Sequence, residues 1–211
     1  AELARTSSLK PESAAMSDAE LMAALGVPGE APEGRFFPDT YTYAKGSSDL
    51  AILRRAHAAM HKRVEQAWSQ RTPDTPLQSP DDLLKLASIV EKETGRADDR
   101  PMVASVFINR LRIRMPLQTD PTVIYGLGER FDGNLRRKDL QTDTPFNTYT
   151  RAGLPPTPIA LPGRDALMAA VQPATSKALY FVARGDGTSQ FSETLADHNR
   201  AVDKFQRKAA R

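Results

Sequence analysis

The chain has 211 residues, of which 40% are hydrophobic and 26% are charged, so it can bury a core without disulfide bonds. It contains no cysteine, which excludes thiol catalysis, cysteine-ligated zinc and disulfides. Its net charge of +3 permits an anionic partner, but the basic runs at 110–114 and 136–138 are short and lack interleaved aromatic residues, so we do not expect it to bind nucleic acid.

Two helices are predicted in the first third of the chain. Ser17 and Glu20 have the spacing of a capping box and predict a short helix that stops at Gly26. A longer helix is predicted from Ser48 to about Gln70, because apolar residues recur there at spacings of three and four.

The segment between these two helices, residues 27–46, is rich in glycine, proline and aromatic residues. Such a composition is typical of a linker that enters a domain. We therefore expect a domain boundary here, with residues 1–32 as the end of an N-terminal region and residues 33–211 as the main domain.

Two more helices follow in the middle of the chain. Ser79 and Pro80 mark a strong helix start, and the pattern continues to Gly95. The segment 99–111 predicts the next helix, with Pro101 in its first turn.

The second half of the chain changes character. Residues 116–163 contain seven prolines and are expected to form mainly loops. Residues 178–192 predict two strands around a Gly-Asp-Gly turn, and a last helix is expected from about Thr194. Since strands and helices do not alternate, the predicted fold class is α+β: helix-rich, with a small antiparallel β component that includes this late hairpin.

The helix that begins near Pro80 carries two carboxylates close to its apolar side. At 100° per residue, Glu91 lies beside Leu84 and Ala87 on one shoulder of that side, whereas Glu93 lies on the other shoulder. Residues two apart on a helix do not meet, so the pair is not a carboxylate dyad. Three residues on the opposite side are expected to face water: Lys85, Ser88 and Lys92.

Two interpretations of these glutamates remain open from the helical pattern. Each can be a partly buried acid that pairs with an arginine from the segment 109–114. Alternatively, one of them is a general acid, because apolar surroundings favour the proton-carrying form of a carboxyl group. The position beside Leu84 and Ala87 favours Glu91 for that role.

Several long motifs follow one another along the chain. They are ASIVEKET (87–94), VASVFINRLRIRMPLQTDPTVIYG (103–126), FNTYTRAGLPPTPIALPG (146–163), YFVA (180–183) and FSETLADHN (191–199). Together they resemble the endolytic murein transglycosylases of the MltG (YceG-like) family, and the resemblance runs from about Glu33 to Val202.

This resemblance implies a non-hydrolytic lyase that cuts the MurNAc–GlcNAc bond of nascent glycan strands and leaves a 1,6-anhydroMurNAc end. It implies that Glu91, the first glutamate of the EKE triplet, acts as acid and then as base. The nucleophile in this reaction is the C6 hydroxyl of the muramic residue itself, so no second carboxylate is needed to activate water. The alternative is a non-catalytic peptidoglycan-binding or scaffold protein of the same fold. We expect no cofactor and no metal.

Six residues are candidates for substrate binding, and each also has a structural interpretation. Polar residues before a proline can form a turn, Asn147 and Tyr149 can anchor a loop, and Glu93 can support the fold. His198, near the start of the last helix, is compatible with a contact in the cleft or with a capping role. The six candidates are Glu93, Gln118, Thr119, Asp120, Asn147 and Tyr149.

The resemblance also implies a location for the full-length protein. Family members are anchored in the bacterial inner membrane by one N-terminal helix, carry a LysM-like part before the catalytic part, and act at the periplasmic face near peptidoglycan synthases. The apolar runs of this chain are only a few residues long, so the anchor is expected outside it. Residues 1–32 would then be the tail of the LysM-like region.

Overall fold

The computed structural model describes residues 8–207. Its helices are α2 (Asp18–Ala24), α3 (Asp49–Ser69), α4 (Pro80–Glu93), α5 (Arg100–Arg112), α6 (Asp120–Leu127), η1 (Gly128–Arg130), α7 (Arg137–Gln141), α8 (Arg164–Val171), α9 (Leu195–Val202) and η2 (Asp203–Arg207). Strands β1 (Tyr180–Ala183) and β2 (Ser189–Ser192) pair antiparallel, with Tyr180 opposite Ser192.

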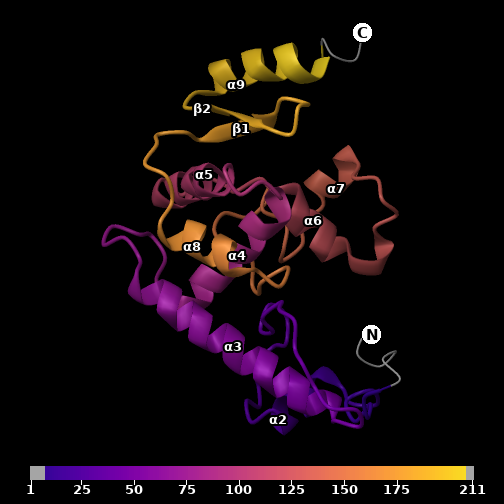
Figure 1. Ribbon diagram of the computed structural model, residues 1–211. Coiled ribbons are helices and arrows are strands. Elements are labelled where there is room, and N and C mark those ends of the chain that lie inside the picture. Colours follow the sequence, from indigo (N-terminus) through magenta and orange to yellow (C-terminus); the bar gives the residue numbers. More distant parts are fainter. Residues whose placement is uncertain (1–7, 208–211) are drawn as a thin grey trace.

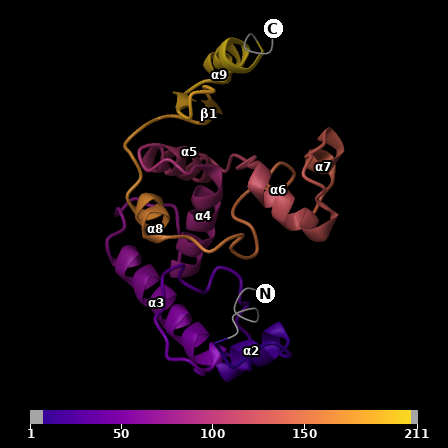
Figure 2. The same cartoon turned by 45° about the vertical axis from the view of Figure 1, so that its right-hand side comes forward.

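The elements are stacked along the long direction of the molecule. Figure 1 shows α3 and the N-terminal segment at one end, the hairpin and α9 at the other, and α4, α5 and α8 between them. In Figures 1 and 2 alike, α4 lies between α8 on one side and α6 with α7 on the other. The C-terminal end of α4 is thus within reach of α6 and of the hairpin layer.

The α+β class is confirmed, and the capping signals locate the helix starts. Ser17 forms the complete capping box with Glu20. The side chains of Ser48, Ser79 and Thr194 cap α3, α4 and α9 in the same way, by accepting a hydrogen bond from a backbone N–H of the first turn.

The expectation of mainly loops at 116–163 is wrong in part, because this segment contains α6, η1 and α7. These helices are short, so they give only one or two turns of periodic pattern. The helix α8 was also not predicted. It has only eight residues, five of them buried, so little more than two turns are available to show a helical pattern.

The core is built around α4. Six apolar residues of this helix are at most 1% exposed, and they pack in one cluster with residues of α3, α5 and α8: Leu83, Leu84, Leu86, Ala87, Ile89 and Val90. Burial of this size fixes the rotation of α4 about its axis, and with it the directions of Glu91 and Glu93.

The expected water-facing position of Ser88 is wrong, since its side chain is fully buried. Its hydroxyl donates to the carbonyl of Lys85 (2.7 Å) and accepts from the backbone N–H of Ile159 (3.0 Å). The segment around Ile159 therefore covers the side of α4 that the helical pattern leaves open.

The N-terminal segment packs along α3. Met22 is fully buried and Arg54 of α3 donates to the carbonyl of Ala24 (2.9 Å). Within residues 8–207, none of the helices is both long and apolar enough to cross a membrane. The domain boundary after residue 32 and the LysM-like origin of the preceding residues stay predictions.

Candidate active site

A pocket of about 350 Å³ lies where the end of α4 meets the start of α6, the hairpin and α9. Its apolar lining comes from Leu117, Tyr180, Phe181 and Leu195. Its polar lining comes from Glu93, Arg110, Gln118, Asp120, Tyr149 and His198. Four of the six predicted substrate-binding residues thus converge here, although they are up to 56 positions apart in the chain (149 − 93).

Glu93 is the last residue of α4, and its carboxyl group is held by a buried neighbour that does not line the pocket. The hydroxyl of Thr119 donates a hydrogen bond to its Oε1. Burial raises the pKa of Glu93; the hydrogen bond from Thr119 opposes this shift, the nearby Asp120 adds to it, and Arg110 opposes it. Burial dominates, so this carboxyl group keeps its proton to a higher pH than an ordinary glutamate.

Thr119 is itself fixed by the surrounding loops. It is 2% exposed, and its backbone N–H donates to the hydroxyl of Thr148 (3.1 Å). The hydroxyl of Thr122 donates to its carbonyl (2.8 Å). Thr119 therefore positions Glu93 and offers almost no surface to a ligand.

Arg110 brings a buried cation to the pocket. It is 7% exposed, and it donates to the carbonyls of Leu179 (2.7 Å) and Leu117 (2.7 Å). Its guanidinium lies 5.2 Å from the centre of the Tyr180 ring. The sequence predicted only that an arginine of segment 109–114 would pair with an acid; it did not single out Arg110 as a site residue.

Tyr149 and Asp120 form a hydrogen-bonded pair at the rim. The Tyr149 hydroxyl donates to Oδ1 of Asp120 (2.6 Å). Burial raises the pKa of Tyr149, and the hydrogen bond to Asp120 raises it further, so the phenol keeps its proton. Gln118 is exposed beside them with φ at 49°, a left-handed conformation that is costly for a residue with a Cβ atom.

Asn147 does not line the pocket, although the sequence suggested that it contacts the substrate. Its side chain is fully buried, and its amide donates to the carbonyls of Leu140 (3.1 Å) and Thr142 (2.7 Å). Its Oδ1 accepts from the backbone N–H of Tyr149 (2.9 Å). Because these bonds occupy its polar atoms, Asn147 holds the loop that presents Tyr149.

Glu91 does not line this pocket. Its Oε2 accepts a hydrogen bond from the backbone N–H of Gly163 (3.0 Å), the N-cap residue of α8. Gly163 has no side chain with which to cap α8, so the carboxylate of Glu91 supplies a partner at the positive end of that helix. The structure therefore separates Glu91 from the predicted substrate-binding residues.

His198, whose role the sequence left open, lines the pocket with Glu93. Its ring stacks on that of Tyr180, with the ring centres 5.2 Å apart and the planes inclined by 23°. Burial lowers the pKa of His198 and the charge of Arg110 lowers it further. The imidazole is therefore neutral at neutral pH.

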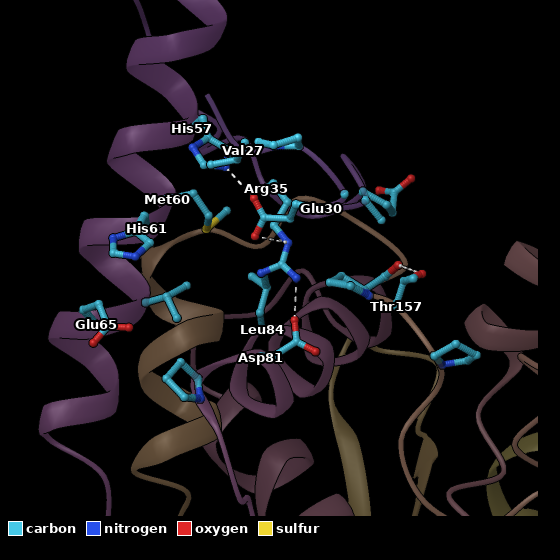
Figure 3. A pocket seen from close by; sticks show the side chains of 18 residues that line it. Val27, Glu30, Arg35, His57, Met60, His61, Glu65, Asp81, Leu84 and Thr157 are labelled. Carbon is cyan, nitrogen blue, oxygen red and sulfur yellow. Dashed lines mark hydrogen bonds and ion pairs between the residues drawn. The ribbon is translucent and has the colours of Figure 1, made fainter. Parts of the chain in front are cut away.

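A larger pocket, of about 820 Å³, lies between the N-terminal segment, α3 and the start of α4 (Figure 3). Arg35 bridges Glu30 (3.4 Å) and Asp81 (2.5 Å) within it, and His57 also pairs with Glu30 (2.9 Å). No predicted site residue lines this pocket. The candidate active site is therefore the smaller pocket at the end of α4.

Comparison with known proteins shows which family this chain resembles. A model of the YceG-like family matches residues 2–204. An endolytic murein transglycosylase of Bacillus subtilis (strain 168) is 39% identical over 173 residues, which cover 82% of this chain and 48% of that protein. An endolytic murein transglycosylase of Streptococcus pneumoniae serotype 2 (strain D39 / NCTC 7466) is 33% identical over 175 residues, which cover 81% of this chain and 31% of that protein.

A solved structure is similar as well. The crystal structure of a yceG-like protein from Listeria monocytogenes superposes with a TM-score of 0.70 at 40% sequence identity, over 79% of this chain and 54% of that one. The chain spans about half or less of the length of the curated relatives. The family match covers nearly all of its residues, and the chain belongs to the YceG-like family.

Proposed function

We propose that this chain is the catalytic part of an endolytic peptidoglycan lytic transglycosylase. Its substrate is the glycan strand, and it cleaves the bond between MurNAc and GlcNAc to leave a 1,6-anhydroMurNAc end. The names of two relatives with 33–39% identity support this activity. We further propose that it acts at the periplasmic face of the bacterial inner membrane, close to peptidoglycan synthases.

We propose Glu93, in place of Glu91, as the acid. The observation that carries this assignment is the position of the two carboxylates: Glu93 lines the pocket, whereas Glu91 caps α8. The raised pKa of Glu93, caused mainly by burial, suits a group that must carry a proton before catalysis. The helical pattern that favoured Glu91 contains neither the position of the pocket nor the degree of burial of each carboxyl group.

The proposed reaction uses this one carboxyl group twice. Protonated Glu93 donates to the oxygen that links MurNAc to GlcNAc, the bond from that oxygen to the muramic C1 breaks, and positive charge develops at C1. The Glu93 carboxylate then takes the proton of the C6 hydroxyl of the same muramic residue, while the oxygen of that hydroxyl bonds to C1. The 1,6-anhydro ring closes, Glu93 is protonated again, and no water is consumed.

The neighbouring residues have separate proposed tasks. Thr119 orients the Glu93 carboxyl group, and Asn147 holds the loop of Tyr149, so both act as positioning residues. Gln118, Asp120 and Tyr149 line the pocket with polar atoms and are the proposed glycan contacts. The Asp120 carboxylate also brings negative charge near the carbon that becomes positive.

Digestion of purified, uncross-linked glycan strands tests this function. Mass spectrometry of the products separates a transglycosylase, which leaves anhydro ends, from a hydrolase, whose reducing ends are heavier by one water. Anhydro ends that disappear in Glu93→Gln are the expected result. Binding of the strands without any cleavage would favour the non-catalytic scaffold.

A further inference from the structure

The first turn of α9 forms one wall of the candidate active site, and nothing in the reaction described above uses it. Leu195 and His198 are three residues apart, so they project from the same face of the helix, and both line the pocket with Glu93. Leu195 is 54% exposed, so its side chain is accessible beside the polar groups of the pocket. This wall offers an apolar surface and an imidazole to a bound sugar.

We propose that His198 binds the glycan directly, with its Nε2–H donating a hydrogen bond to a hydroxyl or acetamido oxygen of the sugar next to Glu93. This inference rests on the proposed function, because it concerns the same pocket and the same ligand.

The position of His198 is fixed by the helix start. The hydroxyl of Thr194 accepts from the backbone N–H of Asp197 (3.1 Å), and the carbonyl of Thr194 accepts from the backbone N–H of His198 (3.0 Å). On the other side, the stacked Tyr180 ring of β1 limits the rotation of the imidazole. A side chain held from both directions loses little conformational entropy when it binds a ligand.

The hydrogen-bonding state of the ring follows from its buried nitrogen. Nδ1 is enclosed and has no hydrogen-bond partner within residues 8–207. A neutral imidazole carries one N–H, and an N–H at Nδ1 would be a buried donor without an acceptor, which costs more than an unused lone pair. The proton therefore resides on Nε2, the nitrogen left to face the pocket.

The charge state agrees with this assignment. Arg110 lies close enough to lower the pKa of His198, and burial acts in the same direction. The ring is thus a neutral donor. A neutral N–H donor forms hydrogen bonds with hydroxyl and carbonyl oxygens, and the sugar residues of peptidoglycan carry both kinds of acceptor.

Nuclear magnetic resonance of ¹⁵N-histidine-labelled protein tests the contact. The chain has three histidines, and His57 and His61 on α3 serve as internal references. In the Glu93→Gln variant, the spectrum of the free protein should show His198 neutral, with its proton on Nε2. Addition of uncross-linked glycan strands should shift the Nε2 and Hε2 signals of His198 but not those of His57 and His61. An unchanged His198 in strand-saturated protein, or a proton on Nδ1, would overturn the proposal.

Kinetics of three variants provides an independent readout. A glutamine amide can reach the position of Nε2, whereas an asparagine amide reaches only that of Nδ1. His198→Ala and His198→Asn should raise KM about tenfold, as expected for one lost hydrogen bond, while His198→Gln recovers part of the loss. Asn199→Ala, an exposed neighbour on the same helix, should leave KM unchanged.

The outcomes distinguish this proposal from the assignment of Glu93. Wild-type kinetics in His198→Ala, together with an inactive Glu93→Gln, would refute the His198 contact alone. Full activity of Glu93→Gln would refute the proposed acid. If thermal denaturation shows that His198→Ala is not folded, the kinetics of His198→Gln and the spectrum of the unaltered histidine still test the contact with the glycan.

Discussion

The hydroxyl of Thr119, buried beside the candidate active site, donates a hydrogen bond to the carboxyl group of Glu93. This contact links the end of α4 to the residue that precedes α6. It lowers the pKa of Glu93 and so opposes the larger effect of burial. The geometry of the proposed acid and its affinity for the proton are therefore set in part by one side chain that a ligand cannot touch.

Thr119→Val should move the pH profile of the reaction. Valine has nearly the same shape but no hydroxyl, so the pKa of Glu93 rises further and the alkaline limb of kcat/KM shifts to higher pH. The maximal kcat should also fall, because the carboxyl group is less well oriented. Thr119→Ser, which keeps the hydroxyl, should retain the wild-type profile. An unchanged limb in the valine variant would show that the contact does not influence the acid.

Glu93→Gln should make the folded protein more stable at neutral pH. The folded-state pKa of Glu93 is raised, so its ionisation destabilises the native state, and this penalty grows as pH rises above about 4.3, the ordinary pKa of glutamate. Glutamine carries no charge and still offers an oxygen to Thr119. Urea unfolding at several pH values should therefore give a stability gain at pH 7 that vanishes below pH 4. A variant that is less stable at pH 7 would contradict the raised pKa.

Glu91 should behave as a structural residue. Glu91→Gln keeps an acceptor for the N–H of Gly163 but loses the charge at the start of α8, and should cost about 0.5 kcal/mol. Glu91→Ala removes both and should cost about 1 kcal/mol. Denaturant unfolding measures these losses. Equal stability of all three proteins would mean that the carboxylate does not cap α8.

Asn147→Ala should destabilise the protein and weaken catalysis together. The variant leaves the carbonyls of Leu140 and Thr142 and the N–H of Tyr149 without their buried partner, at a cost of about 2–4 kcal/mol. The matched control is Asn134→Ala on the exposed loop, which should change the free energy of unfolding by less than about 0.5 kcal/mol. A stable Asn147→Ala protein with a raised KM alone would instead support a direct glycan contact.

Local sequence signals predicted the first helices well, because each of these helices begins at a capping residue that can be recognised in the sequence. Ser17, Ser48 and Ser79 each mark a helix start by the residue type and its spacing alone. The turn around Asp186 likewise predicted the hairpin. In contrast, α8 has only eight residues and α7 only five, so both are too short to show a clear periodic pattern.

The sequence predicted part of the lining of the pocket but not its geometry: Gln118, Asp120 and Tyr149 lie there with Glu93, whereas Arg110 was not singled out. The helical angles correctly separate Glu91 from Glu93, since that separation depends only on α4. Whether Glu91 or Glu93 lines a pocket depends on how the segment of Thr119 and the helix of His198 fold over the end of α4. These residues are 26 and 105 positions from Glu93 in the chain (119 − 93 and 198 − 93). Contacts at such separation leave no periodic trace in a sequence.

The most direct measurement compares the products that Glu93→Gln and Glu91→Gln release from purified glycan strands, by mass spectrometry after matched digestion. With Glu93 as the acid, Glu93→Gln should form anhydroMurNAc ends at a rate lowered by about 10²–10⁴-fold, whereas Glu91→Gln should stay within a few-fold of the unaltered protein. Loss of anhydro ends in Glu91→Gln with full activity in Glu93→Gln would contradict the assignment.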